Sequence, residues 1–549
     1  MFKSKFYVLI LLVVSLVISS CGQKKTEVTN DPAADANVTA PGELPIVKEK
    51  ISLNIGLPGA PTVTDYETNA YTVWLREQTN IDISFTLFPY VDSAKKLDIV
   101  LASNGELPEV LIGFNMNDSF FQRYADQEVF LTLNDYVEND AFWLNKMFEE
   151  TNVPNLKKHL ISANGNMYFM PYLTEQTGNY WPNKAWINQS WLDKLGLPVP
   201  ETTEDFRAVL KAFKEKDPNG NGKADEIPFS GSKNGFMQNP YNFLFNAFIY
   251  ADIQDNNYYL VENGKVDVAY NKPEWKAALK YMSELASEGL LDIQSFVQDS
   301  QSLKTIAQNP DSNILGSVPS ASLGELFGTV KERLAEYVGL PPLKGPEGVQ
   351  YSYMRAQTPQ TLGIITKYCK NPLAAFRLMD FMLSEESALR ARYGVPGVDW
   401  LEPTEDDKCM FENIGAEAKV ITILPYGTVQ NSHWQSMHPV FRSLAISDGM
   451  AWDGDPLNDE YLKALYLPLY MNKGPKEYVT KQLFTLDEAE EIDALRAEIN
   501  AFVTESIGMF IAGEKNVDTE WDKYISDLEK MNLKRYIELS QSGYDKFSK

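Results

Sequence analysis

Cysteine and histidine are scarce in this chain of 549 residues, which contains three of each. Three cysteines are too few for a disulfide scaffold, an iron–sulfur protein or an array of zinc ribbons. The three histidines, at positions 159, 433 and 438, leave little material for a zinc centre or a Ser-His-Asp relay. These two shortages argue against several metal-dependent and nucleophilic classes of enzyme.

Positive charge is also in short supply. The chain has 50 Lys and Arg against 75 Asp and Glu, a formal net charge of −25. Because affinity for nucleic acids depends mostly on neutralising phosphates, we expect no nucleic-acid partner. Aromatic residues, in contrast, make up 12% of the chain, and its length is enough for a large core and more than one domain.

The N-terminus has the pattern of a secretory signal peptide, residues 1–20. Lys3 and Lys5 precede an apolar run from Phe6 to Ile18, and two small residues follow. The run is shorter than the roughly 20 residues that a membrane-spanning helix needs, which makes a genuine span the less favoured alternative. The order Ile18-Ser-Ser-Cys21 resembles a bacterial lipobox. This resemblance implies cleavage before Cys21 and a lipid on its thiol.

Residues 21–50 are rich in Ala, Thr, Asn, Asp, Pro and Lys and show little periodicity. Such a composition is typical of a disordered tether. With a lipid on Cys21, this tether would hold the folded body at the outer face of the cell membrane. Cys369 and Cys409 could pair in that environment, and the sequence leaves this open.

The folded body is expected to start with a parallel α/β unit. Residues 51–57 and 81–87 alternate apolar and polar side chains, as strands do, and residues 109–112 suggest a short buried strand. Residues 69–77 and 93–102 between them have the pattern of helices. This strand–helix order implies a parallel sheet with crossover helices.

Further elements are predicted by capping signals and apolar periodicity. The expected helices follow Thr202, Asn271, Asn371 and Thr485, and the expected strands span 337–340 and 362–365. Thr485-Leu-Asp-Glu488 has the form of a capping box. The sequence thus predicts a large mixed α/β protein with more helix than strand.

A cation-binding loop is the sharpest local motif. Oxygen-bearing side chains recur at alternate positions from Asp217, and Gly222 permits a tight turn, a pattern suited to a hard cation that takes six to eight oxygens. The predicted ligands of a structural Ca²⁺ are Asp217, Asn219, Asn221, the carbonyl of Lys223, Asp225 and Glu226. The loop departs from the EF-hand pattern, because Pro228 occupies the twelfth place. The alternative is a hydrated turn, but three neighbouring carboxylates favour a neutralising cation.

Longer stretches of the chain resemble extracellular solute-binding lipoproteins of ABC importers (family 1), and especially the long subfamily that binds oligosaccharides and alginate. The resemblance covers most of the chain. The matching segments are 186–197, 202–206, 217–230, 272–279, 288–292, 371–376, 393–400, 520–524 and 543–545.

This resemblance implies an α/β fold of the periplasmic-binding-protein type II, a helix-rich, two-lobed clamp with a hinge between its lobes. Lobe 1 would comprise residues 51–165 and 356–430. Lobe 2 would comprise residues 166–355 and most of the helical region 431–549. The resemblance further implies structural calcium in the loop 217–226, a solute held in the cleft, delivery of that solute to ABC permease subunits, and a monomer.

Candidate solute ligands come from three loops that combine aromatic and polar residues, as sugar clefts do. They are Tyr180, Trp181, Trp186, Tyr393, Asp399, Trp400, His433 and Trp434. Relatives commonly have Glu where this chain has Pro396, which removes a polar contact. The alternative for each Trp is packing in the core, which is the favoured interpretation for Trp275.

The preferred function is a non-catalytic carbohydrate receptor. A neutral oligosaccharide is the preferred solute, because the net charge disfavours long polyanions, but peptides and acidic sugars stay open. One rival is an exported glycoside hydrolase, which would need two carboxylates across a sugar site. Another is a peptide-binding receptor or sensor that uses the same clamp.

Overall fold

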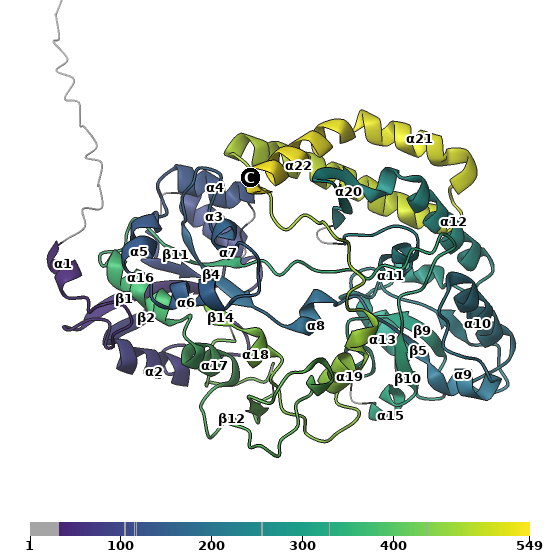
Figure 1. Ribbon diagram of the computed structural model, residues 1–549, viewed down its shortest axis with the longest axis horizontal. Coiled ribbons are helices and arrows are strands. Elements are labelled where there is room, and N and C mark those ends of the chain that lie inside the picture. Colours follow the sequence, from purple (N-terminus) through teal and green to yellow (C-terminus); the bar gives the residue numbers. More distant parts are fainter. Residues whose placement is uncertain are drawn as a thin grey trace, which may run out of the picture.

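The computed structural model describes residues 32–548 except 104, 105, 115, 117, 254, 255, 329, 426 and 436. Two β-sheets form the centres of two lobes, which lie on the left and right of Figure 1. The predicted two-lobed α/β fold is confirmed. The predicted signal peptide and Cys21 lie outside the described residues.

Six strands in the order β14-β4-β11-β3-β1-β2 form the sheet of the first lobe. Their bounds are β1 Ile51–Pro58, β2 Ile81–Phe88, β3 Val110–Ile112, β4 Phe169–Thr174, β11 Gln360–Ile365 and β14 Val440–Arg442. β1 pairs in parallel with β2 and β3, as the strand–helix order predicted, whereas β11 runs antiparallel to β3 and β4. The first lobe therefore combines a parallel unit with strands from much later in the chain.

Helices surround this sheet. They are α2 Ala70–Thr79, α3 Ser93–Ala102, α4 Asp118–Asp126, α5 Asn134–Asn139, α6 Trp143–Glu150, α7 Leu156–His159, α16 Pro372–Phe381 and α17 Glu385–Tyr393. Asp380 of α16 is buried, and its carboxylate accepts the backbone N–H groups of Phe142, Trp143 and Leu144 at the start of α6. This anion satisfies the unpaired donors at the start of the helix and joins two helices that are far apart in the sequence.

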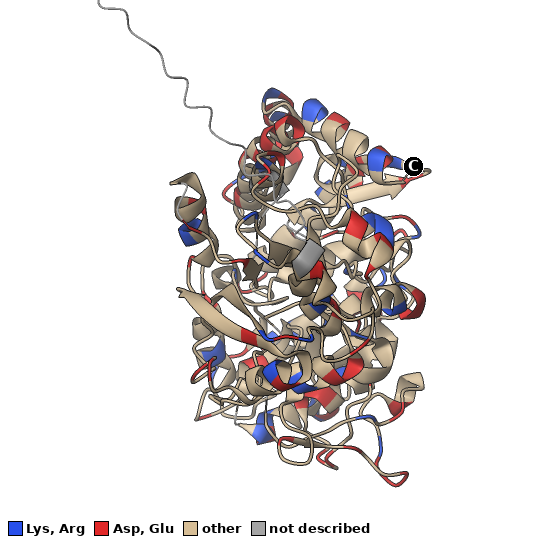
Figure 2. Ribbon diagram, turned by 90° about the vertical axis from the view of Figure 1, so that its left-hand side faces the viewer, with Lys and Arg blue, Asp and Glu red and all other residues tan. Residues whose placement is uncertain are grey.

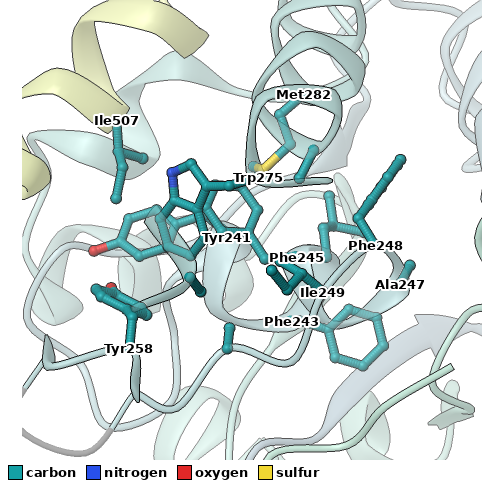
Figure 3. Close-up of a cluster of buried hydrophobic side chains, with 14 of the residues drawn as sticks. Tyr241, Phe243, Phe245, Ala247, Phe248, Ile249, Tyr258, Trp275, Met282 and Ile507 are labelled. Carbon is teal, nitrogen blue, oxygen red and sulfur yellow. The ribbon is translucent and has the colours of Figure 1, made fainter. Parts of the chain in front are cut away.

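The second lobe has a four-stranded sheet in the order β10-β5-β9-β6. Its elements are β5 Ala185–Asn188, α9 Gln189–Leu195, α10 Thr203–Glu215, β6 Ile227–Phe229, α11 Pro240–Leu244, the hairpin β7 Tyr259–Glu262 and β8 Lys265–Val268, α12 Pro273–Ser287, α13 Ser300–Ala307, β9 Leu315–Pro319, α14 Gly324–Phe327, α15 Lys331–Leu334 and β10 Tyr337–Leu340. Trp275 lies at the centre of its core, in edge contact with Phe245 and Tyr258 (Figure 3). The interpretation of Trp275 as a core residue is confirmed.

The C-terminal part of the chain adds α19 Asp459–Tyr466, α20 Leu486–Ile511, α21 Val517–Lys530 and α22 Leu533–Ser548. The predicted capping box of Thr485 and Glu488 is present at the start of α20. This helix packs on α12 of the second lobe and also touches α4 of the first (Figure 1). It therefore spans the gap between the lobes on one side.

The chain passes between the two lobes three times. The crossings run from Thr174 to Ala185, which includes α8 Thr177–Tyr180, from Leu340 to Gln360, and from Arg442 to Asp459, which includes α18 Leu444–Ser447. The predicted lobe boundaries need correction at two points. The second lobe cannot start at residue 166, because β4 belongs to the first sheet, and β14 places residues 440–442 in the first lobe rather than in the second.

The predicted tether is shorter than residues 21–50. α1 spans Pro32–Ala36, Val38 forms a bridge with Val47, and Ile46 and Val47 are buried in the core of the first lobe. Arg377 donates hydrogen bonds to the carbonyls of Thr39 and Ala40. Apolar burial and these contacts hold the end of the segment on the body, which composition alone did not reveal.

Two further features concern the thiols and the surface. Cys369 and Cys409 are both buried and free, so they do not form the disulfide that the sequence left open. β12 Trp400–Leu401 and β13 Ile421–Thr422 form a short two-stranded ladder. On the side turned to the viewer in Figure 2, basic and acidic residues are interspersed. None of the helices among the described residues has both the length and the apolar character to cross a membrane.

Candidate functional site

A cavity of about 300 Å³ lies between the lobes, next to the carboxyl end of β3. In open α/β sheets, ligands bind outside the carboxyl ends of the strands, where the strand order reverses. In the first lobe this reversal lies at β1, because β2 pairs with one side of it and β3 with the other. Met116, which follows β3, and Phe121 and Gln122 of α4 line the cavity. We call this cavity the cleft.

Both lobes and a crossing segment contribute to the wall of the cleft. The first lobe adds His159, Ser162, Ala163 and Phe169, and the second adds Tyr250, Asp252, Asn257 and Tyr259. The crossing segment between them adds Met354, Ala356, Thr358 and Pro359, and β11 of the first lobe adds Thr361. A ligand in this space would contact both lobes, and so could stabilise one relative arrangement of them.

Hydrogen bonds fix the tyrosines of the second lobe. The Tyr250 hydroxyl donates to the carbonyl of Met354 at 3.2 Å, which joins this wall to the crossing segment. The Tyr259 hydroxyl lies 2.7 Å from that of Tyr536 and 3.0 Å from Ser540 Oγ, both on α22. Burial raises the pKa of Tyr250 well above its ordinary value, so the hydroxyl stays protonated. These aromatic faces are held in place, as binding of a sugar ring requires.

Residues 478–484, here called the C-terminal strap, close the cleft on a third side. Lys481 Nζ donates to the carbonyl of His159 at 2.5 Å, a contact between the strap and the first lobe. Leu483 donates its N–H to the carbonyl of Gly543 at 3.0 Å, and a Cβ at residue 543 would lie only 2.5 Å from the ring of Phe484. Glycine is needed there because the strap lies directly on α22.

The charges of the cleft are few and of both signs. Asp252 is the one carboxylic acid among the described residues that line it, and Lys481 and Arg496 supply positive charge. Arg496 donates to Asp493 at 3.1 Å, while its Nε is buried with no hydrogen-bond partner among the described residues. Burial and the nearby Lys481 lower the pKa of His159 to about 4, so this imidazole is neutral at pH 7. The cleft thus offers aromatic faces and mostly neutral hydrogen-bonding groups.

A second cavity of about 340 Å³ also lies between the lobes, lined by residues of β4, α8, α17, β13, β14 and α19. The first two crossings pair beside it, since Gln176 and Gln357 exchange hydrogen bonds and Arg355 donates its N–H to the carbonyl of Tyr180. The helices of the cleft, α4 and α20, lie above these crossings in Figure 1, and α17 and α19 lie below them. We call this space the rear cavity.

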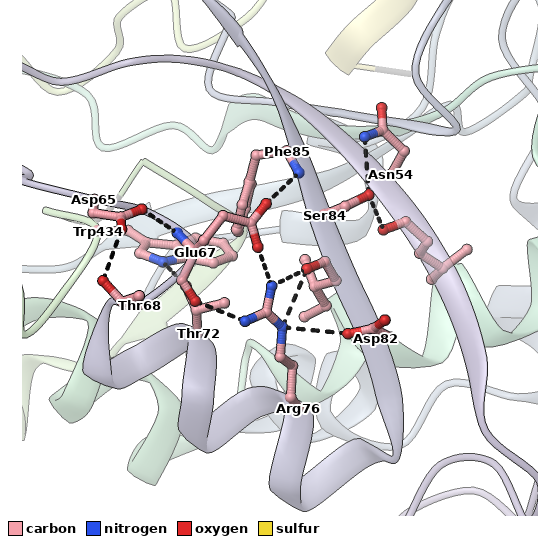
Figure 4. A network of polar contacts seen from close by, with 12 residues as sticks. Asn54, Asp65, Glu67, Thr68, Thr72, Arg76, Asp82, Ser84, Phe85 and Trp434 are labelled. Atoms are coloured by element: carbon pink, nitrogen blue, oxygen red, sulfur yellow. Dashed lines mark hydrogen bonds and ion pairs between the residues drawn. The ribbon is translucent and has the colours of Figure 1, made fainter.

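Four of the predicted solute ligands are in the core instead, which corrects the sequence prediction. Trp186 and Trp434 have no exposed surface, and their Nε1 atoms donate to Ser320 O at 3.0 Å and to Thr72 Oγ1 at 2.8 Å. Figure 4 shows Trp434 beside Thr72 and Phe85, near the polar network of Arg76 and Glu67. Trp400 Nε1 donates to Gly394 O at 3.1 Å, and His433 Nδ1 accepts the N–H of Gln435 at 3.1 Å. Each of these rings is buried, and each polar atom named here already has a protein partner.

The other predicted ligands lie in different places. The carboxylate of Asp399 accepts the N–H of Val395 at 2.8 Å and holds its own turn together. Trp181 packs into the core of the second lobe and is 8% exposed. Tyr180 is half-buried on the first crossing, and Tyr393 lines the rear cavity. A role of Tyr180 and Tyr393 in binding solute stays a prediction.

The loop of residues 217–226 connects α10 to β6 in the second lobe. Asp217 has a positive φ of 48°, and its carboxylate accepts the N–H groups of Gly220, Asn221 and Gly222 at 3.0–3.1 Å. Gly222 has a φ of 73°, as the tight turn required. The hydrogen bond from the N–H of Gly222, at the sixth place of the loop, to the carboxylate of Asp217, at the first place, wraps the backbone around the oxygen-bearing side chains.

The oxygens of this loop fit a hard cation in kind. The amides of Asn219 and Asn221 donate to the Asp225 carboxylate at 2.9–3.1 Å, so a cation would need these amides to turn their oxygens inward. Glu226 Oε1 is buried without a hydrogen-bond partner among the described residues, and burial together with Asp217 and Asp225 raises the pKa of its carboxyl. Within the described part of the chain, no three His, Cys, Asp or Glu side chains form a ready-made metal site.

Sequence reasoning missed most of the cleft. Gln122, Tyr250, Tyr259, Tyr478 and Arg496 lie on five separate segments, none with a motif of its own. One signal was available, because the strand at 109–112 was predicted and the segment after a parallel strand is a preferred site for ligands. The partners from the second lobe gave no comparable signal.

Comparison with known proteins decides the family. Residues 60–389 match the model of the bacterial extracellular solute-binding proteins. The chain belongs to this family. Across 98% of its length it is 28% identical to the fructooligosaccharide ABC transporter substrate-binding protein FusA of Streptococcus pneumoniae, of which 97% is covered. A segment covering 41% of the chain is 32% identical to 42% of the lipoprotein LipO of Bacillus subtilis.

Solved structures of solute-binding proteins share the fold. The structure of FusA with kestose has a TM-score of 0.70 at 24% identity, over 90% of this chain and 99% of that one. The HMO-binding, ABC-transporter-associated solute-binding protein of Bifidobacterium longum infantis has a TM-score of 0.73 at 20% identity, over 91% of this chain and 100% of that one. The alginate-binding protein AlgQ2, solved without calcium ion, has a TM-score of 0.65 at 19% identity, over 91% and 99%. These likenesses confirm the two-lobed fold.

Proposed function

We propose that the protein is a receptor that captures an oligosaccharide between its two lobes and delivers it to the permease of an ABC importer. The cleft carries this proposal, since aromatic faces and neutral polar groups from both lobes converge in one space. Its relatives support the solute class, because FusA is a fructooligosaccharide-binding subunit of an ABC transporter and was solved with kestose. Solute that touches both lobes would favour the closed arrangement, which a permease could distinguish from an open one.

The alternative of a glycoside hydrolase has weaker support. Such an enzyme places two carboxyl groups about 5 to 9.5 Å apart across the sugar. The described wall of the cleft contains one carboxylic acid, Asp252, together with Lys481 and Arg496. This composition favours binding over hydrolysis.

Calcium is the proposed cofactor. The residues that would hold it are those predicted from the sequence, with Asp217 and the buried Glu226 as the charged ligands. The EF-hand variant of FusA that was solved with fructo-nystose supports a cation loop in a relative. The ion would supply charge neutralisation and would brace the connection between α10 and β6.

Attachment to the outer face of the membrane is the last part of the proposal. The signal pattern and Cys21 support it, and so does the similarity to the lipoprotein LipO. The structure describes the chain from residue 32, so about ten residues separate Cys21 from the described body. At full extension these span roughly 35 Å, which would keep the receptor close to the membrane and to a permease within it.

Calorimetric titration with neutral oligosaccharides such as kestose tests the receptor function. Saturable binding without product formation is expected. Tyr478→Ala, which removes an aromatic ring from the cleft, should weaken binding by about tenfold, or about 1.4 kcal/mol. Tyr368→Ala is the matched control, because Tyr368 is an exposed tyrosine on the first lobe outside the lining of the cleft. Turnover of the sugars would instead favour the hydrolase.

A further inference from the structure

Residues 394–430, here called the excursion, leave the first lobe after α17 and return to it. The return is fixed by Gln430, which forms a β-bridge with Val63 of the first lobe. Between these ends, Phe411 is buried in the core of the second lobe, and the amide of Asn413 donates to a backbone carbonyl of α19 at 2.8 Å. The excursion therefore contacts both lobes, so its shape depends on how they are arranged.

The ladder β12–β13 in the excursion has an inner and an outer face. Trp400 points inward, where it packs with other buried residues in a small core, and Thr422 beside it lines the rear cavity. Because successive side chains of a strand point to opposite faces, Leu401 and its register partner Ile421 point outward, and so does Ile423. Leu401 is 41% and Ile423 is 51% exposed. The outer face is thus apolar and separate from the rear cavity.

This outer face, which we call the docking face, lies at the rim of the molecule. β12 is at the lower edge in Figure 1, away from both sheets. The carbonyl of Asp399 accepts the N–H of Ile423 at 2.9 Å, which places Val398, 64% exposed, beside this face. A group of exposed apolar side chains with polar surroundings is typical of a site that contacts another protein.

Carboxylates dominate the charge of the excursion around these residues. Between Leu401 and Leu424 there are six acidic side chains and two lysines. All of the six except Asp407 are exposed. They are Glu402, Glu405, Asp406, Asp407, Glu412 and Glu417, and the lysines are Lys408 and Lys419. A partner that matches this surface therefore has apolar side chains flanked by positive charge.

We propose that the docking face binds the permease of the ABC importer, through an extracytoplasmic loop of the permease in which apolar residues are flanked by Lys or Arg. Apolar contact at the centre supplies most of the affinity, and the surrounding charges guide association. This inference rests on the proposed receptor function, because it names the surface through which the receptor meets its permease.

The charge of the excursion also disfavours other occupants. Anionic lipid headgroups would be repelled by its carboxylates, so a membrane surface is a poor match. In a symmetric dimer the same patch meets itself, which would place carboxylates against carboxylates. A basic loop of the permease has neither disadvantage.

Contact of the excursion with both lobes links docking to the solute. A permease bound to the docking face favours the arrangement of the lobes in which this face has the form described here. Solute that favours the same arrangement then tightens docking, and by linkage docking tightens solute binding by the same factor. The permease would thereby distinguish a loaded receptor from an empty one.

Binding to right-side-out membrane vesicles tests the proposal. The vesicles are prepared from the producing cells after deletion of the gene for this chain, and the purified protein has Cys21→Ala so that no lipid inserts it. Saturable binding is expected, and it should tighten when kestose is added. Leu401→Glu and Ile423→Glu should each raise the Kd about tenfold or more. Ile293→Glu is the matched control, because Ile293 is 47% exposed on the second lobe.

A second pair of substitutions tests the charge. Glu405→Gln combined with Asp406→Asn should slow association with the vesicles several-fold at low salt, and the difference should shrink as the salt concentration rises. Glu514→Gln combined with Asp522→Asn is the control, since both residues are exposed in the C-terminal helical region. An equal effect of this control pair would contradict a specific role of the excursion.

The partner is identified by p-benzoylphenylalanine at position 423, photo-crosslinking in the vesicles and mass spectrometry. A crosslink to a permease subunit supports the proposal. A crosslink only to a second copy of this chain overturns it, and so does equally tight binding to protein-free liposomes of the same lipids.

Melting curves first confirm that each variant is folded. The proposal is also overturned if the protein with Cys21→Ala alone shows no saturable binding to the vesicles, or if folded Leu401→Glu and Ile423→Glu variants bind them equally well. Titration of kestose separates this proposal from the receptor function. Both variants should keep the kestose Kd of the protein with Cys21→Ala alone, whereas a chain that is no receptor binds no sugar in any variant.

Discussion

Arg123 of α4 and Glu490 of α20 form an ion pair that connects the two lobes, with 3.2 Å between Nη2 and Oε1. Their side chains are 41% and 52% exposed, so this pair adds little to the stability of either lobe. It exists only while the lobes are this close. The ion pair therefore stabilises the closed arrangement of the lobes relative to the open one, rather than the folded state relative to the unfolded state.

Removal of this ion pair should weaken solute binding without unfolding the protein. Arg123→Gln and Glu490→Gln are each expected to raise the Kd for a bound oligosaccharide about 1.4- to fivefold, which matches the roughly 0.2–1 kcal/mol of exposed pairs. Titration at low and high salt measures this, and the difference should shrink with salt. Arg535→Gln is the control, because Arg535 and Glu491 form a similar pair within the second lobe. An equal loss of affinity in this control would contradict the assignment.

The three histidines make stability depend on pH below neutrality. Burial lowers the pKa of His159, His433 and His438 to about 4 each, against about 6.5 in an unfolded chain. Between these values the unfolded state binds more protons than the native state, so stability is lost as the pH falls from 6.5 towards 4. Each histidine contributes a slope of about 1.4 kcal/mol per pH unit. Denaturant unfolding at several pH values measures the combined slope.

A variant isolates one of these contributions. His438 has no exposed surface, and His438→Gln should lower the slope between pH 5 and 6 by about one proton. The variant is also expected to be less stable at pH 7, which does not affect the comparison of slopes. A stability that is flat from pH 6.5 to 5 in the unaltered protein would show that these imidazoles are not held neutral.

Trp434 is expected to matter for stability rather than for recognition. Its ring packs edge-on against Tyr71 and Phe85 at 5.1 and 5.4 Å between centroids. Trp434→Ala should cost about 3–5 kcal/mol in unfolding free energy and leave the solute Kd of the folded fraction unchanged. Trp452→Ala, at a half-buried tryptophan stacked on Tyr461, should cost less. A stable Trp434→Ala protein that has lost solute binding would restore this residue to the site.

Calcium should stabilise the second lobe through the loop after α10. Addition of Ca²⁺ is expected to raise the melting temperature, and a chelator to lower it, because a ligand that binds only the native state stabilises it. Asp217→Ala should abolish this response, since its carboxylate orders three backbone N–H groups of the loop. Asp311→Ala, at an exposed loop aspartate, is the control. Identical melting curves with Ca²⁺ and with chelator would reject the metal.

Cys21 should decide the attachment to membranes. Cys21→Ala is expected to move the protein from the membrane fraction to the medium or to the soluble extracytoplasmic fraction, because a lipid requires the thiol. Fractionation followed by immunodetection measures this. Equal retention of the variant in membranes would contradict lipidation.

The sequence predicted local elements well where pattern and capping coincide. The capping boxes at Thr202 and Thr485 begin α10 and α20 as expected, and the strand at 337–340 has the predicted bounds. These features depend on neighbours within a few residues, so the sequence contains their cause. The extent of the tether was misjudged because Ile46 and Val47 are buried by contacts with distant segments.

The solute site could not be derived in the same way. Trp186 and Trp434 have neighbours as polar and aromatic as those of any sugar-binding loop, yet partners from Ser320 and Thr72 place both rings in the core. Conversely, Tyr250 and Arg496 carry no local signal and reach the cleft only through tertiary packing. Whether an aromatic ring lines a cleft or packs in a core depends on which distant segment packs against it. That partner cannot be identified from the neighbouring residues in the sequence.

The position of Phe547 has a practical consequence. Its ring lies 4.6 Å from that of His159, so the last turn of α22 rests on the first lobe directly beside the wall of the cleft. A purification tag fused behind residue 549 would start two residues from this contact and would interfere with the approach of the two lobes. Immobilisation for biosensor work is therefore better made through the segment that precedes residue 32, which leaves this contact untouched.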